Sequence, residues 1–313
     1  MPKPDIDLGV GSGSHAEQTG AVMVKFEQVC LKEKPDLVIV VGDVNSTMAC
    51  TITAKKLGIQ VAHVEAGLRS GDMGMPEEIN RLCTDVLCDY LFTTDLGANG
   101  NLRAEGVADE KVVFVGNVMI DTLLHHRAMA EKLTTGRYLG LEAGNYATLT
   151  LHRPSNVDDE EVLSGICEAL AIISESLPIV FPIHPRTRKM MEAFSLLHHL
   201  EPRSDGKGFL VTEPLGYLEF LNLNMNARLV LTDSGGLQEE TTVLGVPCIT
   251  LRQNTERPIT IEQGTNVLVG NDKNKILAAA NDVLDGRGIS GRVPEKWDGK
   301  SAERIVEWLI ANV

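Results

Sequence analysis

Aromatic residues, cysteines and long hydrophobic runs are all scarce in this sequence. Aromatic residues make up only 4% of the 313 residues, and both tryptophans lie near the C-terminal end, so no aromatic platform for stacking bases is visible. The six cysteines form no CxxC pair and mostly lie in apolar segments, which predicts reduced core thiols and no zinc site. No apolar run approaches the roughly 18–20 residues that cross a bilayer, so we expect no membrane partner.

Basic residues are also fewer than acidic ones. Lys and Arg total 29 against 43 Asp and Glu, which gives a formal net charge of −14. This balance argues against a nucleic acid partner, because a phosphate backbone is bound by basic surfaces. An anionic ligand would have to be held by a local cluster of basic groups or by helix N-termini. The chain opens Met-Pro-Lys-Pro-Asp, without a secretory or transit pattern, so we expect a cytoplasmic protein.

The sequence is otherwise an alternation of short runs rich in Val, Ile and Leu with amphipathic stretches. The run Asp36–Asp43 is almost wholly apolar, as a strand buried on both faces must be. Further strands are expected at Ile59–Glu65, Tyr90–Thr94, Val112–Val115, Ala147–Leu151, Ile179–Ile183, Phe209–Thr212, Leu229–Thr232, Cys248–Leu251 and Val267–Val269. Helices are expected at Thr19–Lys32, Pro76–Cys88, Glu160–Ser176 and Gly236–Leu244. This alternation predicts βαβ units, and therefore an α/β fold of parallel sheets with helices on both faces.

The chain is long enough for two such domains. The first series of strands ends near Gly116, and a helical stretch (Asp121–Leu133) and a Gly-rich passage precede the second series. We therefore expect a first Rossmann-like domain at 1–118, joined by a C-terminal helix at 301–313, and a second at 119–300. Open parallel sheets bind ligands at the carboxyl ends of their strands.

Three carboxylates of the first half lie at junctions between a strand and a helix. Asp43 and Glu65 end strands, and Glu77 opens the helix that follows Pro76. The spacing of Glu77 and Arg81 puts both on one face of that helix. A single strand-end Asp is often only a helix cap, but three such carboxylates in one half favour a functional site.

The second half carries basic and glycine-rich strand ends. His152 and His184 each end a strand and are followed by arginines, which is typical of an anion site. The stretch Leu231–Glu240 runs from an apolar strand through Ser-Gly-Gly into a helix, so its backbone N–H groups could bind a phosphate, and Glu239 or Glu240 a ribose. Arg252 follows another strand.

Four stretches together resemble the non-hydrolysing UDP-N-acetylglucosamine 2-epimerases: His63–Asp72 with Pro76–Arg81, Leu151–Arg153, Thr232–Glu240 and Thr255–Pro258. The resemblance runs from near the start to the last helix. It implies two Rossmann-like domains of the glycosyltransferase-B type, a cytoplasmic homodimer, and an isomerase that inverts C2 of UDP-N-acetylglucosamine for surface polysaccharide synthesis. The implied ligand is a UDP-sugar, and no metal or redox cofactor is required.

The implied mechanism is elimination of UDP to a 2-acetamidoglucal followed by re-addition, which needs carboxylates near C2 and cationic support for the diphosphate. Asp43, Glu65, Glu77 and His152 match the catalytic set of the family. The resemblance assigns UDP or substrate binding to Arg81, His184, Leu215, Tyr217, Ser234, Gly235, Gly236, Glu240 and Arg252. Of these, Ser234, Gly235 and Gly236 would hold the phosphates and Glu240 the ribose.

One departure concerns the start of the chain. Members of the family begin with a strand and a Gly-Thr-Arg-Pro-Glu loop that has no counterpart here, so we expect a first domain that is incomplete at its N-terminus and has exposed apolar edges. Three alternatives to the simple epimerase stay open. They are a retaining glycosyltransferase, a UDP-diacetamido-glucuronate 2-epimerase, and a non-catalytic UDP-sugar-binding protein.

Overall fold

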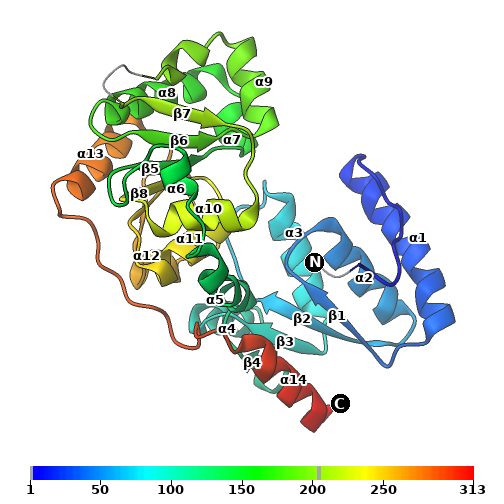
Figure 1. The fold of residues 1–313 in the computed structure, drawn as a ribbon. Coiled ribbons are helices and arrows are strands. Elements are labelled where there is room, and N and C mark those ends of the chain that lie inside the picture. Colours follow the sequence, from blue (N-terminus) through cyan, green and yellow to red (C-terminus); the bar gives the residue numbers. More distant parts are fainter. Residues whose placement is uncertain (1–2, 203–205) are drawn as a thin grey trace. The chain divides into compact units, whose positions relative to one another are not determined.

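The computed structural model describes residues 3–202 and 206–313. The chain divides into two compact units (Figure 1): unit 1 comprises Met1–Val118 with Lys300–Val313, and unit 2 comprises Met119–Gly299. Each unit holds a parallel sheet with helices around it, which confirms the predicted α/β fold class. None of the helices in the described ranges combines the length and apolarity that spanning a bilayer requires.

Unit 1 contains, in its described residues, a four-stranded parallel sheet of order β1-β2-β3-β4. Its strands are β1 (Leu37–Val41), β2 (Gln60–Ala66), β3 (Tyr90–Thr93) and β4 (Val112–Phe114). Its helices are α1 (His15–Glu33), α2 (Asn45–Lys56), α3 (Pro76–Leu87), α4 (Leu96–Ala104) and α14 (Ser301–Asn312), with a 3-10 turn at Asp109–Lys111. Polar caps start two of these helices: Ser14 and Glu17 form a capping box at α1, and Asp95 accepts from the Ala98 N–H at α4.

The prediction that the first strand is buried on both faces was wrong. β1 lies at the edge of its sheet, and its residues alternate between buried and exposed. Val40 is 6% exposed and belongs to a core cluster, whereas Ile39 is 48% and Val41 is 52% exposed. An apolar run shows that a strand can be buried. Whether one or both of its faces are covered depends on its place in the sheet.

The C-terminal helix α14 completes the core of unit 1. The Trp308 ring stands edge-on to Tyr90 and Phe92 of β3, with ring centroids 5.0 Å and 5.5 Å apart. Ile305 is buried in the same cluster, and the Arg304 guanidinium donates to the Val115 carbonyl at 3.0 Å. The last residues of the chain therefore pack on a sheet built from the first half.

Unit 2 contains, where described, a six-stranded parallel sheet of order β10-β9-β8-β5-β6-β7. Its strands are β5 (Ala147–Thr150), β6 (Ile179–Pro182), β7 (Phe209–Thr212), β8 (Leu229–Thr232), β9 (Cys248–Thr250) and β10 (Asn266–Leu268). Its helices are α5 (Val118–Ala130, from its second residue), α6 (Thr135–Tyr138), α7 (Pro154–Val157), α8 (Glu160–Ser174), α9 (Pro185–Ala193), α10 (Tyr217–Met225), α11 (Gly235–Leu244), α12 (Ile259–Glu262) and α13 (Lys273–Leu284), with a 3-10 turn at Leu197–Leu200.

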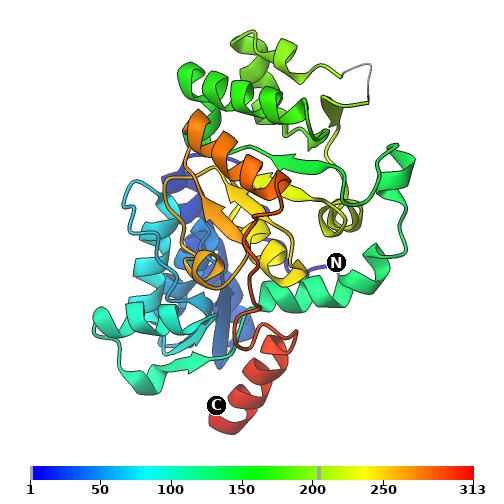
Figure 2. The ribbon, with the colours of Figure 1, turned by 90° about the vertical axis from the view of Figure 1, so that its left-hand side faces the viewer.

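The central strands of unit 2 are buried on both faces, as their apolar sequences require. Every residue of β8 is buried, and helices α8 and α13 pack together over the sheet (Figure 2). The chain builds β5, β6 and β7 in one direction and then returns to place β8, β9 and β10 on the other side of β5. The strand order therefore reverses between β5 and β8, and the carboxyl ends of strands at such a reversal are where open α/β sheets bind ligands.

Candidate active site

A pocket of about 410 Å³ opens in unit 2 at the reversal between β5 and β8. Thr150 and Leu151 from the end of β5 line it, together with residues that follow β6 and β8. It brings together seven of the predicted ligand-binding and catalytic residues: His152, His184, Leu215, Tyr217, Ser234, Gly236 and Glu240. The rings of His152 and His184 lie 5.9 Å apart, centroid to centroid.

His152 is held by a buried aspartate that the sequence analysis did not select. The Nδ1 atom of His152 lies 2.8 Å from Asp233 Oδ1. The other oxygen of Asp233 accepts the backbone N–H groups of His152 at 2.9 Å and Arg153 at 2.8 Å. Asp233 is fully buried, and although burial alone would raise its pKa, the His152 ring and these N–H donors lower the pKa below its usual range. Asp233 therefore occupies Nδ1 of His152, which leaves Nε2 as the ring nitrogen that can contact a ligand.

The two glycines at the start of α11 have different functions. A Cβ on Gly235 would lie 2.6 Å from Arg257 Nη1 and 2.8 Å from Glu256 Oε1, so the helix start packs directly on a buried ion pair. Gly236 and Ser234 line the pocket, whereas Gly235 does not. Ser234 is the N-cap residue and makes no side-chain capping bond. The start of α11 thus presents backbone N–H groups to the pocket without a bulky side chain.

The structure distinguishes the neighbouring carboxylates of α11. Glu239 is 2% exposed, and its Oε1 lies 2.8 Å from Arg257 Nε, which makes it part of the buried support. Glu240 lines the pocket and accepts the Tyr217 hydroxyl at 3.1 Å. Burial raises the pKa of Glu240, an effect that the Tyr217 hydrogen bond offsets only in part. Of the two, Glu240 is therefore the candidate for contact with a ribose.

Arg252 does not line this pocket. Its side chain is buried, and its Nη2 atom lies 2.7 Å from Glu256 Oε2. Glu256 also pairs with Arg257, and the two arginines lower its pKa strongly even though burial opposes the charge. The resemblance assigned Arg252 to UDP or substrate binding; in this structure Arg252 pairs with Glu256, in the charged cluster that the start of α11 packs on.

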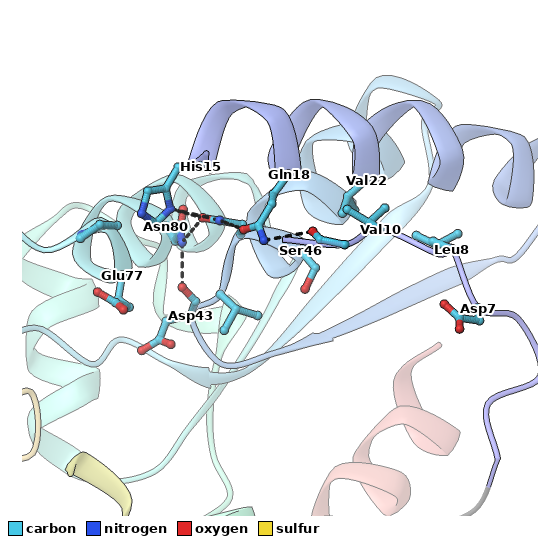
Figure 3. A pocket seen from close by; sticks show the side chains of 14 residues that line it. Asp7, Leu8, Val10, His15, Gln18, Val22, Asp43, Ser46, Glu77 and Asn80 are labelled. Carbon is cyan, nitrogen blue, oxygen red and sulfur yellow. Dashed lines mark hydrogen bonds between the residues drawn. The ribbon is translucent and has the colours of Figure 1, made fainter. Parts of the chain in front are cut away.

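A second pocket, of about 470 Å³, lies in unit 1 and holds Asp43 and Glu77. Figure 3 draws both carboxylates at one end of this pocket. The backbone oxygen of Asp43 accepts Asn80 Nδ2 at 2.8 Å, and its carboxylate Oδ2 lies 3.0 Å from Arg81 Nη2. Polar side chains that the sequence analysis missed line the rest of the pocket: His15, Gln18, Asn45 and Asn80. Asn80 lies within the family stretch Pro76–Arg81 but was not selected, and none of the other three lies in a family stretch.

Arg81 positions groups of unit 1 rather than lining its pocket. Its side chain is 2% exposed and contacts Asp43 and, at 2.7 Å, Glu78 Oε2. Glu78 is equally buried and accepts the N–H groups of Ser70 and Gly71 at 3.0 Å each. Although Glu77 and Arg81 share the expected spacing, the ion pair that forms joins Glu78 and Arg81. Glu78 is thus structural, and Glu77 is the glutamate that lines the pocket.

Glu65 has an unusual backbone. Its φ angle is 71°, and β2 shifts register against β3 between Val64 and Ala66, around this residue. A left-handed conformation at a non-glycine residue costs about 1–3 kcal/mol and is concentrated at functional sites. Glu65 is half-buried and does not belong to the lining of the pocket that Asp43 and Glu77 share. The strained bulge is consistent with a constrained functional position at the end of β2.

Comparison with solved structures defines the class of protein. A crystal structure of the Methanocaldococcus jannaschii UDP-GlcNAc 2-epimerase in complex with UDP-GlcNAc and UDP matches with a TM-score of 0.90 and 46% identity, covering 100% of this chain and 86% of that one. The molecule is thus of the glycosyltransferase-B type, with two Rossmann-like parallel sheets.

The family follows from the sequence comparisons. The model of the UDP-N-acetylglucosamine 2-epimerase family matches residues 1–310, and the chain belongs to this family of isomerases. The UDP-N-acetylglucosamine 2-epimerase of Methanocaldococcus jannaschii is 46% identical over 319 aligned residues, which cover 99% of this chain and 84% of the relative. The UDP-2,3-diacetamido-2,3-dideoxy-D-glucuronate 2-epimerase of Pseudomonas aeruginosa is 41% identical over 312 residues, with the same coverage.

Proposed function

We propose that this protein interconverts UDP-N-acetylglucosamine and UDP-N-acetylmannosamine. The observation that carries the proposal is the pocket of unit 2, where Asp233 orients His152 beside the glycine-rich start of α11. This arrangement suits a nucleoside diphosphate. Helix N–H groups bind phosphate oxygens, an imidazole supports the charge that develops on the departing UDP, and Glu240 receives a ribose hydroxyl. Leu215 and Tyr217 supply the wall against which the uracil packs.

The carboxylates of unit 1 supply the proton chemistry in this proposal. A base removes the C2 proton as UDP leaves C1, which gives 2-acetamidoglucal, and UDP adds again after C2 is protonated on the opposite face. Asp43, Glu65 and Glu77 share the proton transfers and the positioning of the sugar. Arg81 acts through Asp43, because its guanidinium holds that carboxylate. His184, which lines the pocket of unit 2, supports the bound nucleotide in this proposal.

The test is to incubate the purified chain with UDP-N-acetylglucosamine alone and to separate the products. We expect UDP-N-acetylmannosamine, with traces of 2-acetamidoglucal and UDP. Product without any acceptor excludes a retaining glycosyltransferase. A parallel incubation with the diacetamido-glucuronate donor, the substrate named for the Pseudomonas relative, tests the alternative epimerase. Binding of UDP with turnover of neither donor would contradict the proposal and favour a non-catalytic binding protein.

Two adjacent glutamates give a matched pair of variants. Glu77→Gln should lower turnover by about 10²-fold or more, because a proton-transfer group is lost, while UDP affinity and thermal stability stay close to wild type. Glu78→Gln should instead lower the melting temperature, because its buried charge pairs with Arg81 and binds the loop at Ser70 and Gly71. Equal losses of UDP affinity and stability in Glu77→Gln would show that Glu77 is structural.

The proposal extends to the setting of the enzyme. Like the family it resembles, the chain would act in the cytoplasm as a homodimer that uses UDP-sugars for surface polysaccharide synthesis. Light scattering of the purified protein tests the dimer directly, since a monomeric mass at micromolar concentration would contradict it.

A further inference from the structure

His63, two residues before Glu65 on β2, has acceptor oxygens at both ring nitrogens. Its side chain is fully buried, its Nδ1 atom lies 2.6 Å from Asp85 Oδ1, and its Nε2 atom lies 2.9 Å from the Gly42 carbonyl oxygen. A carbonyl oxygen only accepts, so Nε2 must carry a hydrogen. Gly42 directly precedes Asp43, so this bond holds the turn that carries one of the proposed catalytic carboxylates.

The opposite end of the same network holds the loop after Glu65. Asp85 Oδ2 accepts the Gly67 N–H at 3.1 Å and lies 2.7 Å from Arg69 Nη1. Burial opposes the charge of Asp85, but the bonds and charges of His63 and Arg69 outweigh it and lower the pKa of Asp85 below its usual range. An ionised carboxylate also only accepts, so Nδ1 of His63 must carry a hydrogen as well.

Two charged side chains are enclosed beside His63, those of Asp85 and Arg69. Arg69 also pairs with Glu105, at 2.7 Å between Nη2 and Oε2, but the Glu105 carboxylate is 36% exposed and lies at the surface. The Cys88 thiol near Asp85 stays protonated, because burial, and then the charge of Asp85, raises its pKa.

We propose that His63 is a positioning residue, held as a doubly protonated imidazolium, that ties the turn carrying Asp43 to the loop following Glu65. Three features make this link rigid. Gly67 adopts φ +79°, a Cβ there would lie 2.6 Å from the Ala98 carbonyl oxygen, and its own carbonyl accepts Asn101 Nδ2 at 2.9 Å. The importance of the link for turnover rests on the proposed function, whereas the charge state of His63 does not.

Histidine-selective ¹⁵N NMR of the full chain tests the charge state without any substrate. The His63 ring, assigned by its disappearance in His63→Asn, should show both nitrogens protonated at neutral pH. A His63 ring with one unprotonated nitrogen at neutral pH would overturn the imidazolium assignment.

His63→Asn tests the positioning role, because the amide nitrogen can replace Nδ1 toward Asp85 but leaves the Gly42 carbonyl without its donor. We expect kcat to fall by about 10²-fold with KM and UDP affinity within about twofold, since displacing a catalytic group by about 1 Å has this effect. His125→Asn, at an exposed position on α5, is the matched control and should behave as wild type. Unchanged kcat in folded His63→Asn would overturn the positioning role.

Amide hydrogen exchange gives a readout that is independent of catalysis. In His63→Asn, exchange at Gly42 and Gly67 should become at least about tenfold faster while helix α8 of unit 2 is unaffected. Unchanged protection at both glycines would overturn the proposed link even if the wild-type chain turned over no substrate. Loss of wild-type turnover with intact His63 signals would instead contradict only the proposed function.

Discussion

A histidine that supports a departing diphosphate must keep one ring nitrogen for the ligand and have the other held in a fixed direction. The His152–Asp233 pair meets this requirement, since the fully buried carboxylate contacts Nδ1 and also fixes the backbone of His152 and Arg153. Asp233 also places a carboxylate charge directly against the His152 ring. The charge matters as much as the geometry, and a variant can separate the two.

Asp233→Asn keeps the shape of the side chain but removes its charge. We expect turnover to fall by about 10²-fold or more, with a smaller fall in UDP affinity, because the amide removes the negative charge that lies against the His152 ring. Steady-state kinetics and UDP titration check this. Asp158→Asn is a control, because the exposed ion pair of Asp158 with Arg186 should contribute little. Near wild-type turnover in Asp233→Asn would contradict the assigned role of His152.

Sequence reasoning found His152 but not its partner, for a physical reason. Asp233 directly precedes the Ser-Gly-Gly motif that drew attention, yet it contacts a residue 81 positions earlier in the chain. That contact depends on β5 and β8 being neighbours in the sheet, and strand order is not visible in the alternation of strands and helices. The same holds for His63 and Asp85, which lie on β2 and α3 and meet only in the folded unit.

At the scale of elements, the position of helix α11 depends on the buried charged side chains that its first residues pack on. Gly235 rests on the Glu256–Arg257 pair, so its missing Cβ determines how deep the helix start can sit. Arg252, Glu239 and Glu256 complete this support. In a sequence, a pair of glycines indicates either a tight turn or a phosphate-binding loop. In this structure the first glycine allows close packing on the ion pair, and the second leaves the pocket open to a ligand.

Gly235→Ala tests this arrangement. The added methyl group would displace the start of α11, so we expect a destabilisation of about 1–3 kcal/mol from overpacking and a loss of UDP affinity of about tenfold or more. Calorimetric UDP titration and denaturant unfolding measure the two effects. Gly165→Ala is the control, because a Cβ there, within α8, meets open space and should slightly stabilise the helix. Wild-type UDP affinity in Gly235→Ala would argue against α11 as the phosphate-binding element.

Val40 and Val41 lie on opposite faces of strand β1, so the same substitution can be compared at a buried and at an exposed position. Val40→Thr places a hydroxyl in the core and should cost about 1–2 kcal/mol, whereas Val41→Thr, at a 52% exposed position, should change the free energy of unfolding by less than about 0.5 kcal/mol. Urea unfolding followed by amide exchange in β2 and β3 compares the two. Equal costs would mean that the Val41 face is covered in solution.

At the scale of the whole molecule, the sequence predicted the class of fold and the strand ends well, because buried parallel strands give continuous apolar runs that differ sharply from helices. It did not predict which members of a residue pair are presented to a pocket. Within each adjacent pair, Glu77 with Glu78 and Glu239 with Glu240, the sequence gives no reason to choose one glutamate over the other. The position of Arg81 or Arg257 in the fold decides which of the two forms a buried ion pair. Burial of Arg81 and Arg252 was likewise invisible, since an arginine at a strand end or helix face resembles a ligand group until its carboxylate partner is located.

The two units have different functions in this proposal, and one experiment can test both. Unit 1 carries the carboxylates assigned to proton transfer, and unit 2 carries the pocket assigned to UDP. Proton NMR of the chain with UDP-N-acetylglucosamine in deuterated water reports on both at once. The proposed mechanism predicts deuterium at C2 of the sugar and accumulation of the manno epimer. Line broadening of the UDP signals, with the C2 proton fully retained, would show binding without C2–H cleavage and would contradict the account.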